Sequence, residues 1–191
     1  MSENDPFIHI EGSVFKFLSS LFKKKDVQGV LVGGYALIAN KVQRTTFDID
    51  FLMTASDCGK IEPDLAKAGY SVFNRQDAFV QYRSAVPGLR DIDFLIGDAH
   101  TIEKIISKGK TVTIAGEPFF IPCALHLIEM KLHSIAGNRR RELKDFPDIV
   151  QLLTANAIDP EGSSMKELFE KYKLQDLYQR LLNISGTNHG R

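Results

Sequence analysis

The sequence contains no tryptophan and only two cysteines, Cys58 and Cys123, which lie far apart and do not form a pair with metal-binding spacing. Such sparse use of cysteine suits a reducing cytoplasm. No apolar run approaches the length of a membrane span, and the stretch MSENDPFIHIEGS at the start lacks the basic and apolar regions of a signal peptide. The sequence therefore predicts a cytoplasmic protein without a membrane partner.

The chain also lacks net charge, because 24 lysine and arginine residues balance 24 aspartate and glutamate residues. No overall field attracts nucleic acid, so any contact with a polyanion must be local. The 191 residues are 43% hydrophobic and 25% charged, as in soluble globular proteins, and they are enough to bury a core. These values predict one ordinary domain, or a core with a modest appendage.

The apolar periodicity predicts a mixed α/β core over residues 1–121 and a helical portion, residues 122–191, packed on it. A helix is expected around Pro63. Because proline is tolerated only in the first turn of a helix, this helix should begin near Glu62. Pro118 should confine its strand to a sheet edge. Strands are expected at residues 30–32, 47–53, 71–74, 78–83, 89–96, 111–115 and 118–121.

Two aspartates, Asp48 and Asp50, alternate with apolar residues in the expected strand 47–53. Residues i and i+2 of a strand lie on one face, roughly 6.5–7 Å apart along the chain. Two carboxylates there are costly unless a cation lies between them. This arrangement predicts a divalent metal.

A second pair, Asp91 and Asp93, has the same alternation in the expected strand 89–96. Three carboxylates from two adjacent strands would form an oxygen-only site, which suits Mg²⁺ or Mn²⁺. Two such ions can activate an attacking oxygen and stabilise a leaving pyrophosphate. The alternative is that these are solvent-facing aspartates on strands with one wet face. The two pairs together, with the glycines that precede them, favour the metal site.

Those glycines, Gly33 and Gly34, follow the expected strand 30–32 and precede an expected helix at residues 35–40. A glycine turn lets backbone N–H groups approach a phosphate, and a helix N-terminus favours anions. The alternative is a tight connection that requires positive φ.

In this order and spacing, Gly33-Gly34-Tyr35-Ala36-Leu37 and Arg44-Thr45-Thr46-Phe47-Asp48-Ile49-Asp50 resemble the signature of the DNA polymerase β-like nucleotidyltransferase superfamily. Within it, the sequence is most similar to small bacterial nucleotidyltransferases of the AbiEii/AbiGii toxin type. Their Lys-rich helix and Arg-x-x-x-Lys-Asp-x-x-Asp segment match Lys131, Arg140 and Lys144-Asp145-Phe146-Pro147-Asp148. The resemblance covers roughly residues 28–153 and implies an α/β (α+β) fold with a mixed sheet.

The resemblance also implies roles for individual residues. Asp48 and Asp50 would ligate the metals, and a third carboxylate would help to deprotonate the acceptor hydroxyl. Asp93 is the first choice for that carboxylate because apolar residues flank it on both sides, and Asp91 is the second. The implied nucleotide-binding residues are Gly33, Gly34, Arg44, Lys131, Arg140 and Lys144, with Asp145 beside them; an i,i+4 charged helix surface is the alternative for Arg140, Lys144 and Asp145.

Two residues depart from the resemblance. Tyr35 replaces the Ser or Thr whose hydroxyl touches the phosphate in many members, which leaves that contact to backbone amides. Pro147 would break a helix unless it lies in a first turn that begins at Asp145.

The resemblance implies metal-dependent transfer of a nucleoside monophosphate from an NTP to an acceptor hydroxyl, with release of pyrophosphate. The acceptor would be tRNA or other RNA, a protein or a small molecule. One alternative is a degenerate nucleotide-binding or partner-binding protein that keeps the fold without turnover. Another is a toxin–antitoxin component that acts mainly by association with a cognate antitoxin.

Overall fold

The computed structural model describes the backbone of residues 6–187 and the side chains of residues 14–184. The chain divides into two compact units, one formed by Met1–Ala36 and Arg44–Cys123 and the other by Leu37–Gln43 and Ala124–Arg191. The division predicted after residue 121 stays a prediction. None of the helices in the described part of the chain is long and apolar enough to cross a membrane.

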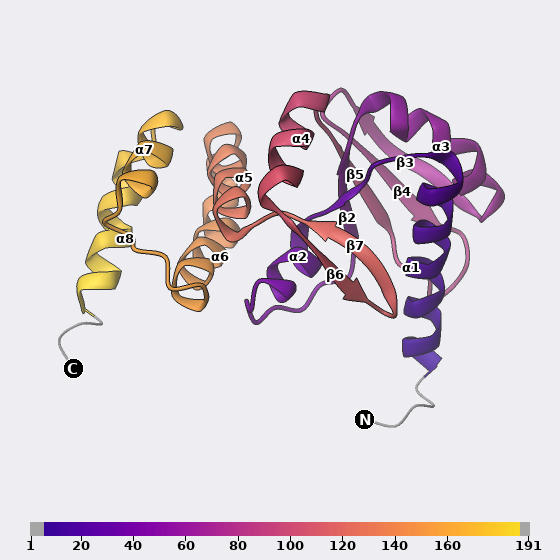
Figure 1. The fold of residues 1–191 in the computed structure, drawn as a ribbon, viewed down its shortest axis with the longest axis horizontal. Helices are drawn as coiled ribbons and strands as arrows, with labels where there is room; N and C mark the ends of the chain where they lie inside the picture. The colour runs from indigo at the N-terminus through magenta and orange to yellow at the C-terminus, as the bar shows by residue number, and fades with distance from the viewer. Residues whose placement is uncertain (1–5, 188–191) are drawn as a thin grey trace. The chain divides into compact units, whose positions relative to one another are not determined.

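The first unit is built on a seven-stranded mixed sheet (Figure 1). The pairs β2–β5 and β1–β7 are parallel and the other neighbours are antiparallel. The expected mixed α/β fold is confirmed. The strand order is β3 (Tyr70–Gln76), β4 (Phe79–Ser84), β5 (Ile92–Ile96), β2 (Ile49–Met53), β1 (Val30–Leu31), β7 (Glu117–Ile121) and β6 (Lys110–Ile114).

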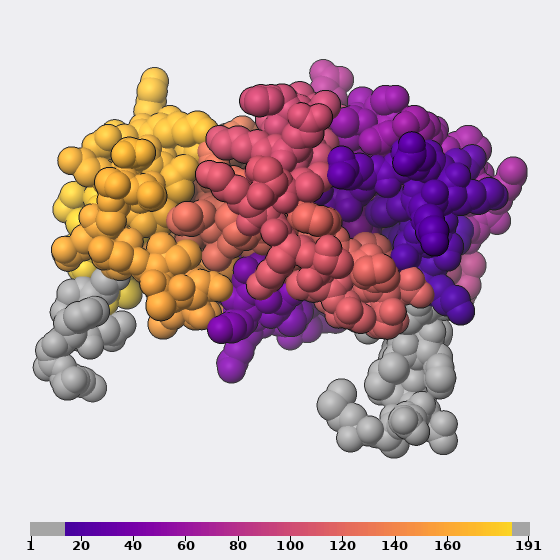
Figure 2. Space-filling model, in the orientation of Figure 1, coloured from indigo at the N-terminus to yellow at the C-terminus, as the bar shows by residue number. Residues whose placement is uncertain are grey.

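Aromatic side chains join the sheet to α1 (Pro6–Lys25), which contacts α3 (Ala55–Lys67). The ring of Phe22 lies edge-on to Phe51, with centroids 5.0 Å apart, and Phe51 stacks on Phe94 at 6.1 Å. Lys25 of α1 pairs with Asp64 of α3 at 2.8 Å. The side chains of residues 14–25 of α1 are seen in indigo in Figure 2. The apolar face of β2 and β5 is therefore fixed, and the aspartates between these residues point to the other face.

The expectation that α3 begins near Glu62 is wrong. Thr54 caps the helix, since its hydroxyl accepts a hydrogen bond from the Asp57 N–H at 3.1 Å, and Pro63 lies inside. The residue four positions before Pro63 is Gly59, whose carbonyl loses its helical donor. The cap and the buried side chains Cys58, Ile61 and Leu65 outweigh that local cost.

The expectation that Pro118 confines its strand to a sheet edge is also wrong. Strand β7 lies between β1 and β6, and β6 is the edge strand. Pro118 pairs with Thr113 of β6, whereas β1 has only two residues and meets β7 at the pair Val30 and Phe120. Because β1 is so short, its pairing with β7 does not require a hydrogen bond from the backbone nitrogen of Pro118.

The second unit is helical, with α5 (Ala124–Gly137), a 3₁₀ turn η1 (Arg139–Arg141), α6 (Glu142–Ala155), α7 (Ser163–Lys171) and α8 (Gln175–Thr187). Residues 37–43 belong with it, and the Asn156 amide donates to the Asn40 carbonyl at 3.0 Å. Pro147 was expected to break a helix unless it lay in a first turn that begins at Asp145, but α6 begins at Glu142 and continues through Pro147. Pro147 therefore lies in its second turn, where the buried residues Phe146, Ile149 and Leu152 hold the helix in place.

Candidate functional site

Two of the predicted acids are direct neighbours on parallel strands. Asp50 of β2 pairs in register with Asp93 of β5, so both side chains lie on the same face of the sheet. Asp48 and Asp91 lie just before their strands, because β2 begins at Ile49 and β5 at Ile92. The expected strand 47–53 is therefore shorter, and Phe47 is exposed. The register places Asp93, rather than Asp91, beside Asp50.

Asp50 also lies against Gly33. A side chain at position 33 would overlap the Asp50 carboxylate, and Gly33 has a φ of +57°, which L residues rarely adopt. The helix α2 (Gly33–Ala39) begins at this residue, two positions before its expected start. The interpretation that the turn requires positive φ is confirmed for Gly33. The interpretation that its backbone N–H groups approach a phosphate stays a prediction.

Gly34 is covered by Thr46. A Cβ at position 34 would overlap the Thr46 side chain, whose hydroxyl donates to the Asp48 carbonyl at 3.3 Å. The Arg90 guanidinium donates to the Thr46 carbonyl at 2.8 Å. The loop before β2 is therefore held between the glycine turn and the segment before β5, which brings these three segments of the first unit together.

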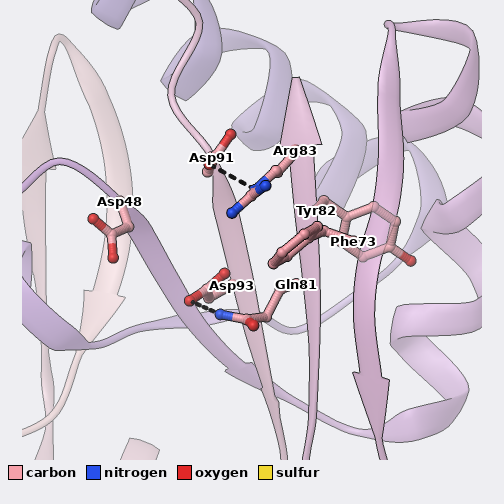
Figure 3. Close-up of a pocket in the computed structure, with 7 residues that line it drawn as sticks. All are labelled: Asp48, Phe73, Gln81, Tyr82, Arg83, Asp91 and Asp93. Carbon is pink, nitrogen blue, oxygen red and sulfur yellow. Dashed lines mark hydrogen bonds and ion pairs between the residues drawn. The ribbon is translucent and has the colours of Figure 1, made fainter. Parts of the chain in front are cut away.

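Asp48 and Asp93 line one cavity of about 230 Å³ in the first unit (Figure 3). Burial raises the pKa of the Asp93 carboxyl above its ordinary value, a hydrogen bond from Gln81 opposes the rise, and the charges of Asp48 and Asp91 add to it. The Gln81 amide donates to Asp93 Oδ2 at 2.9 Å. Asp93 is thus a half-buried carboxylate within the field of two other acids.

The rest of the cavity mixes an aromatic ring with opposite charges. The Arg83 guanidinium lies 3.3 Å from the centroid of the Phe73 ring and 3.9 Å from Asp91. Figure 3 shows Arg83 beside Asp91 and the Tyr82 ring turned away from the acids. The residues that line the cavity are Asp48, Phe73, Gln81, Tyr82, Arg83, Asp91 and Asp93. This wall offers hydrogen-bond donors and acceptors to a polar group placed beside Asp93.

The donor set fits a hard divalent cation, since Asp48, Asp50 and Asp93 offer only carboxylate oxygens and two of them are in register. Within the described side chains, no three His, Cys, Asp or Glu residues already converge as a metal-binding group. One oxygen of Asp93 instead accepts a hydrogen bond from the Gln81 amide.

Lys131 belongs to the second unit and is held there by two buried acids. Its ammonium lies 2.6 Å from Asp145 Oδ1 and 2.8 Å from Asp148 Oδ2. The Arg141 guanidinium donates to Asp145 Oδ2 at 2.8 Å. This explains the Lys-Asp-x-x-Asp pattern structurally: its acids fix the lysine of the preceding helix. A role for Lys131 at a triphosphate stays a prediction.

We expect Asp145→Asn to lower the free energy of unfolding at pH 7 by about 2–4 kcal/mol, because it removes one carboxylate from a buried ion cluster. Burial works to raise the pKa of Asp145, but Arg141 and Lys131 more than offset it, and the pKa is lowered. A lowered pKa contributes stability above the unfolded value, near 3.9, and that contribution is lost as the pH falls through the folded value. The difference between wild type and variant should therefore shrink at acid pH in urea titrations.

The matched control is Asp176→Asn, which breaks an exposed ion pair with Arg139 in the same unit. Exposed pairs contribute about 0–1 kcal/mol, so this variant should stay close to wild type at both pH values. A loss as large as that of Asp145→Asn would contradict the special role given to the buried cluster.

The remaining predicted nucleotide-binding residues belong to different units, Arg44 to the first and Arg140 and Lys144 to the second. Arg44 is partly buried in the loop before β2, whereas Arg140 and Lys144 are exposed in the second unit. Tyr35 is 9% exposed, and its ring lies edge-on to Phe15 with centroids 4.9 Å apart. Tyr35 is thus a core residue, which explains the departure from Ser or Thr.

Five residues of the cavity wall and its support were not anticipated: Phe73, Asn74, Gln81, Tyr82 and Arg83. A signal for Gln81 and Arg83 existed in residues 79–83, where polar residues alternate with Val80 and Tyr82. Strand β4 pairs with β5 so that Gln81 lies opposite Asp93. The polar face of β4 and the polar face of β5 therefore lie on the same side of the sheet.

No protein-family model matches the sequence, and no curated protein matches it. Solved structures do match. The antibiotic-resistance factor ANT(2'')-Ia has a TM-score of 0.61 at 15% identity, with 94% of this chain and 97% of that chain covered. The lincosamide antibiotic adenylyltransferase LnuA, bound to lincomycin, has a TM-score of 0.53 at 17% identity, over 78% and 98% of the chains. The Megavirus polyadenylate synthase has a TM-score of 0.54 at 17% identity, with 82% of this chain and 34% of that chain covered. The chain therefore has the fold of nucleotidyltransferases.

Proposed function

We propose that this protein transfers a nucleoside monophosphate from an NTP to an acceptor hydroxyl and releases pyrophosphate. The observation that carries the proposal is the register of Asp50 and Asp93, with the Asp50 carboxylate packed against Gly33. A glycine turn and paired carboxylates within one small site are what a triphosphate and its cations require. The nucleotidyltransferase fold of the solved neighbours supports the same reaction.

In this account the backbone of Gly33 and Gly34 lies along the phosphates, and Arg44 reaches them from the loop before β2. Asp48, Asp50 and Asp93 would hold the divalent cations. When bound, Mg²⁺ or Mn²⁺ neutralises the triphosphate and stabilises the charge on the leaving pyrophosphate. The Gly33 backbone lies close to the Asp50 carboxylate. Phosphates bound along this backbone would therefore lie next to the acids.

Asp93 also acts as the general base for the acceptor hydroxyl. It takes the proton of the acceptor hydroxyl as that oxygen forms a bond to the α-phosphorus. The bond from the α-phosphorus to the bridging oxygen breaks at the same time, and the electron pair leaves with pyrophosphate. Burial raises the pKa of the Asp93 carboxyl above its ordinary value, which is the direction that makes a carboxylate a better proton acceptor.

For the acceptor, a small molecule is favoured by the size of the cavity and by its mixed wall of Phe73, Arg83 and Asp91. ANT(2'')-Ia was solved with adenylyl-2''-tobramycin and LnuA with lincomycin, which are also small molecules. RNA or protein acceptors remain within the proposal. Membership of the AbiEii/AbiGii toxin type, with a cognate antitoxin as partner, is the finer form of the hypothesis and rests on the sequence motifs.

The test is incubation with each α-labelled NTP, Mg²⁺ or Mn²⁺, and separate pools of tRNA, protein and small polyhydroxylated acceptors. Metal-dependent labelling of one pool, with equimolar pyrophosphate, is the expected result. Absence of labelling in every pool, together with an NTP and metal that do not change the melting temperature, would contradict the proposal. Nucleotide-dependent stabilisation without labelling would instead identify the degenerate, binding-only alternative.

A further inference from the structure

A β-bulge lies at the edge of the candidate site. The register of β3 against β4 shifts between Val72 and Asn74, so Val72 pairs with Tyr82 and Asn74 pairs with Gln81. Phe73 is the extra residue, and it lines the cavity. Bulges commonly re-aim side chains next to active sites. Here the bulge turns Phe73 into the cavity and brings Asn74 beside Gln81.

The two amides form a directed chain of hydrogen bonds. The Asn74 amide nitrogen donates to Gln81 Oε1 at 3.2 Å, and Gln81 Nε2 donates to Asp93 Oδ2 at 2.9 Å. A Gln side chain has a donor end and an acceptor end, and its neighbours decide which end faces which way. Because the Asp93 carboxylate only accepts, the nitrogen end of Gln81 faces it (Figure 3), and the oxygen end accepts from the Asn74 amide.

We propose that Gln81, oriented by Asn74, is the positioning residue that fixes the Asp93 carboxylate for nucleotidyl transfer. The hydrogen bond to Oδ2 sets the rotation of the carboxyl group and thereby the directions in which its two oxygens meet the cation and the acceptor hydroxyl. This inference rests on the proposed function. Supporting partners of this kind typically change metal affinity or activity about 10–100-fold when they are removed.

The decisive variant is Gln81→Met, which keeps the length of the side chain but cannot donate to Asp93. At saturating Mg²⁺ we expect kcat to fall about 10–100-fold while KM for the NTP changes little, because Gly33, Gly34 and Arg44 hold the triphosphate in the proposed site. The affinity for Mn²⁺, measured by electron paramagnetic resonance with a non-hydrolysable NTP, should fall by a similar factor. The melting temperature should stay near that of wild type.

Two further variants make the test specific. Gln81→Glu places a carboxylate beside Asp93 and should be more harmful than Gln81→Met, whereas Asn74→Ala only frees the Gln81 amide to rotate and should be milder. The matched control is Gln76→Met, the same substitution at an exposed position of β3. It should match wild type in kcat, Mn²⁺ affinity and melting temperature.

The outcomes separate this inference from the function on which it rests. Wild-type kcat and Mn²⁺ affinity in Gln81→Met, or an equal loss in Gln76→Met, would overturn the positioning role while the transferase itself stands. A wild-type protein that neither transfers a nucleotide nor binds Mn²⁺ with an NTP would overturn both.

Discussion

Replacement of Asp48 or Asp50 by Asn reduces nucleotidyl transfer by roughly 10²–10³-fold in this account, the scale found when one preorganised electrostatic group is removed. Asn has nearly the shape of Asp but lacks the charge that holds a cation. Folding should not suffer, since the change also relieves repulsion among neighbouring carboxylates. The measurement is initial rates of label transfer from an α-labelled NTP at saturating Mg²⁺, with melting temperatures recorded in parallel.

Asp77→Asn is the matched control, because Asp77 is an exposed aspartate in the turn between β3 and β4 of the same sheet. It should transfer at the wild-type rate. Retention of activity by Asp50→Asn would contradict the assignment of the paired carboxylates, and an equal loss in Asp77→Asn would show that surface charge is the cause.

Gly33→Ala is expected to lower both the stability of the fold and the rate of nucleotidyl transfer. The new methyl group would overlap the Asp50 carboxylate, and the backbone at φ +57° strains any L residue. We expect the free energy of unfolding to fall by about 1–3 kcal/mol from the backbone strain alone. Transfer should fall about 100-fold or more even in the folded fraction, because Asp50 must move, and misplacement by about 1 Å can cost that much. Urea titrations and rates per folded molecule measure the two effects separately.

The control for this variant is Gly59→Ala in α3. Gly59 is exposed in the helix, and nothing lies within 4 Å of the position its Cβ would take. Alanine should stabilise that helix by about 0.5–1 kcal/mol and leave transfer unchanged. If Gly33→Ala were as harmless, the close packing of the glycine turn on Asp50 would have no functional role.

The fold and the central pair of strands could be predicted because they rest on local patterns. Asp50 and Asp93 each alternate with large apolar residues, and burying Phe51 and Phe94 on one face forces both acids to the other. The same logic would have placed Gln81 opposite Asp93 if the pairing of β4 with β5 had been known. The bulge at Phe73 was beyond such reasoning, because Val72 and Phe73 are adjacent and both exposed, so β3 has no apolar alternation in which a one-residue shift could be seen.

The errors at Pro63, Pro118 and Pro147 have a common cause. Each expectation applied a local rule for proline, and in each case tertiary structure decided otherwise. Buried side chains hold α3 and α6 together around their prolines, and the shortness of β1 removes the need for a donor at position 118. Lys131 differs: the motif that includes it was recognised, but its pairing with Asp145 and Asp148 depends on contacts between two helices.

The most direct test of the account is a crystal structure with a non-hydrolysable NTP and Mn²⁺, with anomalous scattering measured to locate the ions. The account predicts a peak between the carboxylates of Asp48, Asp50 and Asp93, beside phosphates that lie on the Gly33-Gly34 turn. Nucleotide bound elsewhere, or a peak away from these three acids at saturating Mn²⁺, would contradict it.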